Sequence, residues 1–169
     1  VWPIEEKEVP QTDVPGEWTS LTQPIPKLPL PFERQGVTTN DLIDYTPEIR
    51  NAVQKLIQNY RIGPLYTPPS IKNAPDGTNG TLSLPYATGG ANWEGSALDP
   101  ETGVLYIPSQ TRIGLMQLVN EPEKSDIEYI SGTSPPPSVF GIPLVKPPWG
   151  RITAINLITG QHQWMIPNG

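Results

Sequence analysis

Two stretches of the chain repeat one pattern: ALDPETGVLYIP, residues 97–108, and AINLITGQHQWMIP, residues 154–167. Each has an alanine, an Asp or Asn two residues later, a Thr-Gly pair, and an apolar run that ends in proline. The Asp or Asn side chain can bond its own backbone two residues on, and glycine supplies the positive φ that a hairpin turn needs. The repeat therefore predicts two β-hairpins that are built alike.

The distance between the repeats suggests a type of β fold. Gly103 and Gly160 hold equivalent places and are 57 residues apart. Propeller blades repeat at roughly 40 to 50 residues, and insertions map to their loops. The proline-rich stretch SPPPSVFGIPLVKPPWG, residues 134–150, lies between the repeats as an obvious insertion. This spacing favours a propeller over a sandwich or a barrel, with Trp164 expected to wedge between adjacent blades.

Composition favours irregular loops on a β framework. The 169 residues include 23 prolines and 15 glycines, and only 17% of residues are charged. Short apolar runs between turn residues predict strands of the following ranges: 82–84, 104–107, 113–119, 151–156 and 162–166.

One stretch has helical periodicity. Apolar residues recur at helical spacing between residues 47 and 60, Thr46 is placed to cap the helix, and Pro47 suits its first turn. We expect one substantial helix there, docked by its apolar stripe on the main body, because a single helix of this length is marginal alone.

The N-terminal stretch is rich in proline. Because proline removes backbone donors and extends the preceding residue, residues 1–36 predict a polyproline-like crossing rather than a sheet. Its large apolar side chains favour a strap pinned to a folded surface over a disordered linker. The predicted organisation is a strap over 1–38, a helical insertion and turn-rich connection over 39–80, and blade segments over 81–169.

Composition also limits the classes of partner. The net charge is −6 and the 11 basic residues are scattered, so no stripe follows a nucleic acid backbone and no nucleic acid partner is expected. The absence of cysteine excludes disulfides and thiolate metal sites. No apolar run reaches the ~18 residues of a membrane span. The start at Val1 leads us to expect a processed chain or a piece of a longer one.

The second repeat resembles a known motif. Ala154, Asn156, Thr159, Gly160 and Trp164 follow the tryptophan docking motif of quinoprotein dehydrogenases, eight-bladed propellers that carry pyrroloquinoline quinone and a divalent cation, usually calcium. The stretches LYTPPS, GGANWEGSALDPETGVLYIPS and KPPWGRITAINLITGQHQWMIPNG are similar to the later part of glucose-dehydrogenase-like members. The resemblance implies a mainly β fold: a partial β-propeller of about two blades, with a proline-rich strap and one helix.

The chain departs from the docking motif in both repeats. Asn156 stands where Asp is commoner, and Ile107 takes the tryptophan position of the first repeat.

The resemblance also implies cofactor-binding residues: Asn92, Trp93 and Glu94. Gly89 and Gly90 would let the backbone approach a ligand closely, the indole offers a flat face to a planar quinone, and the amide offers a donor and an acceptor. The alternatives stay open: Trp93 as a core aromatic, Asn92 as a turn former, and Glu94 as a solvated carboxylate.

Trp149 is the candidate for the substrate pocket, with core packing as its alternative. His162, between two glutamines and without ligands at metal spacing, is interpreted as a surface histidine. No motif matches the family's general base, its metal ligands or its basic residue near the quinone, so no catalytic residue and no metal ligand is assigned. The calcium ligands are expected outside this chain.

The implied function is that of a segment of a quinoprotein dehydrogenase that oxidises a sugar or alcohol hydroxyl, contributing part of the cofactor cradle. Implied partners are the substrate, the remaining blades, and an electron acceptor such as a membrane quinone or cytochrome. The implied location is the periplasm or a membrane facing it. The alternative is a non-catalytic propeller-like binding or scaffold module whose strap and helix meet a protein partner.

Overall fold

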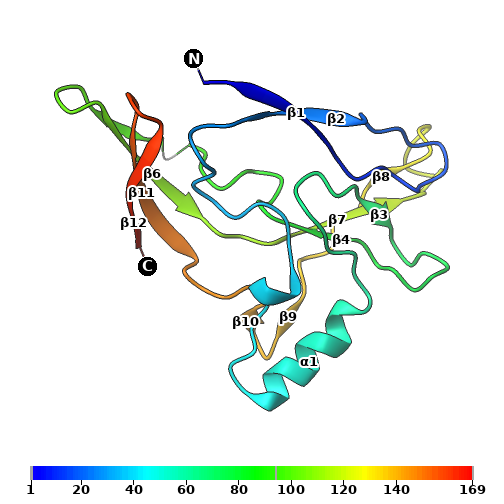
Figure 1. Ribbon diagram of the computed structural model, residues 1–169. Helices are drawn as coiled ribbons and strands as arrows, with labels where there is room; N and C mark the ends of the chain where they lie inside the picture. The colour runs from blue at the N-terminus through cyan, green and yellow to red at the C-terminus, as the bar shows by residue number, and fades with distance from the viewer. Residues whose placement is uncertain (1, 94, 169) are drawn as a thin grey trace.

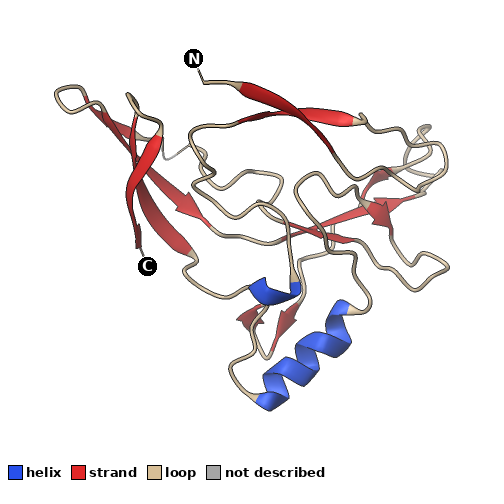
Figure 2. Ribbon diagram, viewed as in Figure 1, coloured by secondary structure: helices blue, strands red, loops and turns tan. Residues whose placement is uncertain are grey.

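The computed structural model describes residues 2–93 and 95–168, and they form a mainly β structure with one α-helix. Figure 1 shows one sheet on the left, a second on the right, and the helix below them. Tan loops make up much of the chain in Figure 2, as the proline and glycine content predicts. The expected mainly β fold with one substantial helix is confirmed. No helix in the described part of the chain has the length and apolar character to cross a membrane.

The first sheet has four antiparallel strands in the order β12-β11-β6-β5. The strands span Ala97–Asp99 (β5), Val104–Gln110 (β6), Gly150–Asn156 (β11) and Gln161–Pro167 (β12). The two repeats are therefore the two hairpins of a single sheet. A four-stranded sheet is the content of one propeller blade, so the reading of the 57-residue spacing as a step from blade to blade is wrong. The spacing includes an insertion, residues 111–149, between the second and third strands of this sheet.

The two hairpin turns match each other closely. Gly103 has φ +66° and Gly160 has φ +71°. Their amides donate to the carbonyls of Asp99 at 2.9 Å and Asn156 at 2.8 Å. The side chain of each of these two residues also accepts backbone N–H groups from its own turn. The predicted local structure of the repeat is confirmed, and Asn156 performs the role of the commoner Asp.

The turn of the first repeat also lowers the pKa of Asp99. The Thr102 hydroxyl and then the Glu101 amide donate to the Asp99 carboxylate and lower its pKa. Because the pKa of Asp99 is lower in the folded than in the unfolded chain, the ionised Asp99 carboxylate stabilises the fold at pH values above the ordinary Asp pKa. This stabilisation is lost as the pH falls through the folded pKa.

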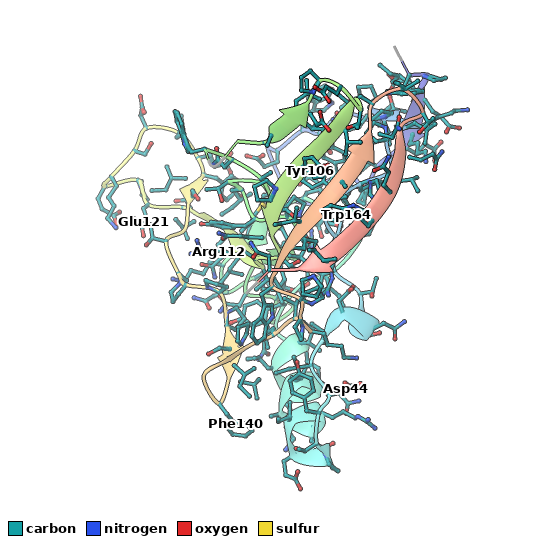
Figure 3. The ribbon with its side chains drawn as sticks, turned by 90° about the vertical axis from the view of Figure 1, so that its left-hand side faces the viewer. Asp44, Tyr106, Arg112, Glu121, Phe140 and Trp164 are labelled. Carbon is teal, nitrogen blue, oxygen red and sulfur yellow. The ribbon has the colours of Figure 1, made fainter. Side chains whose placement is uncertain are left out.

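Ala154 lets two aromatic rings meet on one face of the sheet. It pairs with Trp164 on one side and Tyr106 on the other, and it is fully buried. The two ring centroids are 5.7 Å apart with their planes tilted by 37°, and Figure 3 shows them side by side on the sheet. In this chain Trp164 therefore packs within its own sheet, and 41% of it is exposed.

The second sheet has shorter strands, two from before the first sheet and two from the insertion. Its strands are Ser70–Ile71 (β3), Thr81–Ser83 (β4) and Gly114–Val119 (β7), in the order β3-β7-β4, with Ile130–Ser131 (β8) also paired to β7. A hairpin of Ser138–Val139 (β9) and Ile142–Pro143 (β10) lies near the helix (Figure 1).

The main apolar core lies around this second sheet. It contains Val37, Leu42, Ile43, Val53, Leu82, Leu84, Ile113, Leu115, Val139, Leu144 and Val145.

The helix α1 (Pro47–Ile57) follows a short 3₁₀ turn, η1 (Thr39–Asp41). The Thr46 side chain caps it by accepting the Ile49 amide at 3.2 Å, as predicted. The buried residue Val53 joins the core, so the predicted docking of the apolar stripe is confirmed.

The N-terminal segment contains a sheet, so the prediction of an unpaired polyproline-like crossing is wrong. Ile4–Glu8 (β1) and Thr22–Pro26 (β2) form an antiparallel hairpin. The Lys27 amide donates to the Pro3 carbonyl at 2.9 Å. In an antiparallel pair every second residue donates to the partner strand, so the amides of β2 that donate to β1 belong to its odd-numbered residues. Pro24 and Pro26 lie at even positions, where a missing donor costs no ladder bond.

Residues before and after the β1–β2 hairpin rest on the turn of the second repeat. A Cβ added to Gly160 would lie 3.0 Å from Cζ2 of Trp2 and 3.1 Å from Cβ of Leu28. The Nε2 atom of His162 lies 2.8 Å from the Leu30 carbonyl oxygen. The absent side chain of Gly160 thus leaves the space into which the N-terminal segment packs.

A buried ion pair fixes this segment to the sheet. Glu33 accepts hydrogen bonds from the Thr111 hydroxyl at 2.6 Å and the Ser109 hydroxyl at 3.0 Å. The Arg151 guanidinium lies 3.5 Å from Glu33 and donates to the Thr111 hydroxyl at 2.8 Å. All four side chains are buried, and they join the N-terminal segment, the end of β6 and the start of β11.

Glu33→Ala should destabilise the protein by about 3–5 kcal/mol, because it leaves the buried Arg151 charge without its partner. Glu6→Ala, an exposed position on β1, is the matched control and should change the free energy of unfolding by less than about 0.5 kcal/mol. Urea unfolding of both variants measures this difference. Equal stability of the two variants would contradict the structural importance of the ion pair.

Candidate functional site

Two adjoining cavities lie at one end of the first sheet, where β6 ends and β11 begins. The smaller has a volume of about 390 Å³ and includes the 88–93 loop in its wall. The larger, of about 570 Å³, is lined partly by residues 111–113 and 136–138 of the insertion. Four of the described residues line both cavities: Gln110, Arg112, Gly150 and Asn168.

Strand register brings these shared residues together. Gly150 is opposite Gln110 at the end of the β6–β11 ladder, and the Asn168 amide donates to the Gly150 carbonyl at 2.9 Å. The Gln110 amide donates to the Gly90 carbonyl at 2.7 Å, which attaches the loop to the same strand end. The cavities therefore rest on the ends of three strands.

Asn92 lies in the wall of the smaller cavity. Its Nδ2 donates to the Thr88 carbonyl at 3.1 Å, and its own carbonyl accepts the Gly95 amide at 3.1 Å. Its role as a turn former is therefore seen directly. The Oδ1 atom remains the side-chain acceptor that this residue can offer to a ligand.

Trp93 also lines the smaller cavity, and 95% of it is exposed. Trp93 therefore does not pack into a core formed by the described residues. An exposed indole of this size beside a cavity offers a flat apolar face to a ligand.

Gly90 does permit a close approach, but the approaching group is a side chain of the protein. A Cβ added to Gly90 would lie 2.7 Å from Cγ of Glu33. The expectation that this glycine makes room for a ligand is therefore corrected. Instead, the loop that carries Asn92 and Trp93 lies against the buried Glu33–Arg151 ion pair.

Trp149 lines the larger cavity and is 38% exposed. Its Nε1 donates to the Val145 carbonyl at 2.8 Å, and its carbonyl accepts the Thr111 amide at 2.7 Å. Trp149 thus packs partly into the structure while one part of its ring faces the cavity. The structure brings it to the same strand ends as Asn92 and Trp93.

Glu94, the third residue predicted to bind the cofactor, lies outside the described residues. Among the residues that the structure describes, no group of three or more His, Asp or Glu side chains is placed to hold a metal ion. No catalytic residue was predicted. In the described chain the cavities are lined by apolar residues such as Ile113 and Val145, together with amides, hydroxyls, aromatic rings and one arginine.

That arginine, Arg112, was missed by the analysis of the sequence. Its guanidinium carbon lies 5.6 Å from the centroid of the Tyr86 ring, and Figure 3 shows it below Tyr106 and Trp164 at the end of the sheet. The available signal was the polar stretch SQTR, residues 109–112, directly after the apolar run that ends the first repeat. Loop residues that follow strand ends often carry function.

Comparison with known proteins agrees with this architecture. Residues 1–169 match the model of the β-propeller domain of glucose, ethanol and alcohol dehydrogenases, a family denoted PQQ.

Named relatives match over nearly the whole chain. A quinate/shikimate dehydrogenase (quinone) of Acinetobacter baylyi is 30% identical over 97% of the chain and 22% of its own length. Quinoprotein glucose dehydrogenases are 27% identical in Gluconobacter oxydans, over 99% of the chain and 23% of the relative, and 25% identical in Escherichia coli, over 97% and 22%.

The chain thus spans less than a quarter of the length of these relatives. The family model matches the whole chain, and the four-stranded sheet β12-β11-β6-β5 agrees with a blade of a partial propeller. The chain belongs to the PQQ β-propeller family of glucose, ethanol and alcohol dehydrogenases.

Proposed function

We propose that the chain is a segment of a longer quinoprotein dehydrogenase that oxidises a hydroxyl group of a sugar, an alcohol or a related polyol. The observation that carries this proposal is the exposed Trp93 ring, which lies beside Asn92 in the wall of a cavity. Family membership supports the same reaction class.

The residues of the smaller cavity fit pyrroloquinoline quinone, which is planar and carries carbonyl and carboxylate groups. The Trp93 indole can lie against a planar ring system. Asn92 and Gln110 supply amide groups for the polar rim of the ring. When bound, the quinone supplies the acceptor for the two electrons removed from the substrate.

The chain's own residues position this ligand. Trp93 and Asn92 sit on a loop that is attached to β6 through Gly90 and Gln110 and lies against Glu33. These contacts hold the backbone at the start of the loop, which reduces the ordering cost of binding.

Trp149, in the wall of the adjoining larger cavity, is proposed to contact the substrate. Because the two cavities share strand ends, a ligand in one lies next to a ligand in the other.

The remaining functions are proposed to lie elsewhere in the longer protein. The general base, the calcium ligands and the other blades are proposed to belong to the rest of that protein. The electron acceptor is proposed to be a separate partner such as a membrane quinone or a cytochrome. We further propose a location in the periplasm or at a membrane facing it.

Trp93→Ala in the full-length protein should weaken retention of the quinone by about 10- to 100-fold, since loss of a large apolar contact costs about 1.5–3 kcal/mol. Trp18→Ala is a matched control, because Trp18 is also highly exposed, at 83%, and lines neither cavity. The measurements are cofactor content and dye-linked turnover of both folded variants. Equal retention in the two variants would remove Trp93 from the proposed site.

The isolated chain of 169 residues should show no dehydrogenase activity when pyrroloquinoline quinone and calcium are added. The outer strands β5 and β12 have no further partner within the described sheet, so the cavities are not closed by neighbouring blades. A missing general base alone would remove about 10²- to 10⁴-fold of rate. A dye-linked assay with glucose, simple alcohols and polyols tests this, and turnover that depends on added quinone would refute it.

A further inference from the structure

Arg112 is the only charged side chain among the described residues that line the two cavities. It lies in the wall of both, so its charge acts at their junction. In a protein with net charge −6, a single cation at a cavity junction attracts an anionic group.

Neighbouring residues hold the Arg112 side chain in place. Its guanidinium carbon lies 5.6 Å from the centroid of the Tyr86 ring, and its carbonyl accepts the Tyr86 amide at 3.1 Å. Stacking on an aromatic ring leaves the N–H groups in the guanidinium plane able to donate. The side chain is thus oriented without using its hydrogen-bonding capacity on Tyr86.

Three other arginines of the chain use their side-chain donors within the protein. Arg34 donates to the carbonyls of Lys146 and Pro147, at 2.7 and 2.9 Å. Arg61 pairs with Asp13 at 2.7 Å, and Arg151 is held beside Glu33. No described carboxylate forms such an ion pair with Arg112. A ligand in the cavities that Arg112 lines can therefore supply the acceptor.

We propose that Arg112 binds a carboxylate group of the ligand that occupies these cavities. A planar guanidinium matches the two oxygens of a carboxylate, and the paired hydrogen bonds are among the stronger ones in proteins. The side-chain amides of Gln110 and Asn168, which line both cavities, suit the hydroxyl groups of a polyol. Quinate, named in one relative, combines a carboxylate with ring hydroxyls.

The carboxylate can come from either of two sources: a hydroxy-acid substrate or the quinone cofactor. Assignment of the cavities to these ligands rests on the proposed function, but carboxylate binding at Arg112 can be measured without turnover.

The test uses the full-length protein with Arg112→Gln and Arg112→Lys. Arg50→Gln, which changes an exposed arginine of helix α1 that lines neither cavity, is the matched control. The probes are quinate, its neutral methyl ester and pyrroloquinoline quinone, each titrated by calorimetry. The pair of quinate and methyl quinate isolates the charge of the carboxylate from the shape of the ring.

If the carboxylate that Arg112 binds belongs to the substrate, Arg112→Gln should weaken quinate binding by about 10- to 100-fold. Binding of methyl quinate and of the quinone should then be unchanged. For a cofactor carboxylate, the same variant should weaken binding of the quinone and leave quinate binding unchanged. In either case Arg112→Lys should recover part of the affinity, because it keeps the charge but loses the paired donors. Arg50→Gln should match the wild type.

Unchanged affinity of Arg112→Gln for quinate and for the quinone would overturn the proposal. An equal loss of quinate and methyl quinate binding would also overturn it, because packing rather than charge would then explain the effect. Failure of the proposed function would give a different result. The wild type would then oxidise no substrate in the presence of the quinone, while the calorimetric difference between wild type and Arg112→Gln could still be measured.

Discussion

The arrangement of this chain depends on the buried pair of Glu33 and Arg151. A buried charge needs a partner and hydrogen bonds. Here the hydroxyls of Ser109 and Thr111 donate to the Glu33 carboxylate, and Arg151 donates to the Thr111 hydroxyl. The requirement fixes three distant segments at once: the N-terminal segment, the end of β6 and the start of β11. It also provides the surface on which Gly90 and its loop rest.

The candidate site follows from this constraint. The ends of β6 and β11 belong to one ladder, and the residue after β12 is joined to it because the Asn168 amide donates to the Gly150 carbonyl. The loop with Asn92 and Trp93 joins them through one backbone hydrogen bond, from Gln110 to Gly90. A ligand in these cavities is therefore met by side chains on rigid strand ends and on a short loop that these ends support.

The apolar core and the candidate site belong to different parts of the chain. The core lies between α1, the second sheet and the β9–β10 hairpin, whereas much of β5 and β12 in the first sheet is exposed. A sheet with exposed apolar side chains such as Leu98 and Ile166 has the character of a blade that packs against neighbours. This agrees with the family, in which the chain covers less than a quarter of each relative.

The sequence by itself determined the local structures: the two hairpin turns at Gly103 and Gly160, the helix with its Thr46 cap, and the loop with Asn92 and Trp93. Each depends on residues a few positions apart, whose conformational preferences can be read directly. Only the tertiary structure decided that both hairpins share one sheet, that Glu33 meets Arg151, and that Arg112 stands between two cavities. These depend on strand pairing across an insertion and on contacts between residues more than 100 positions apart, which no local pattern specifies.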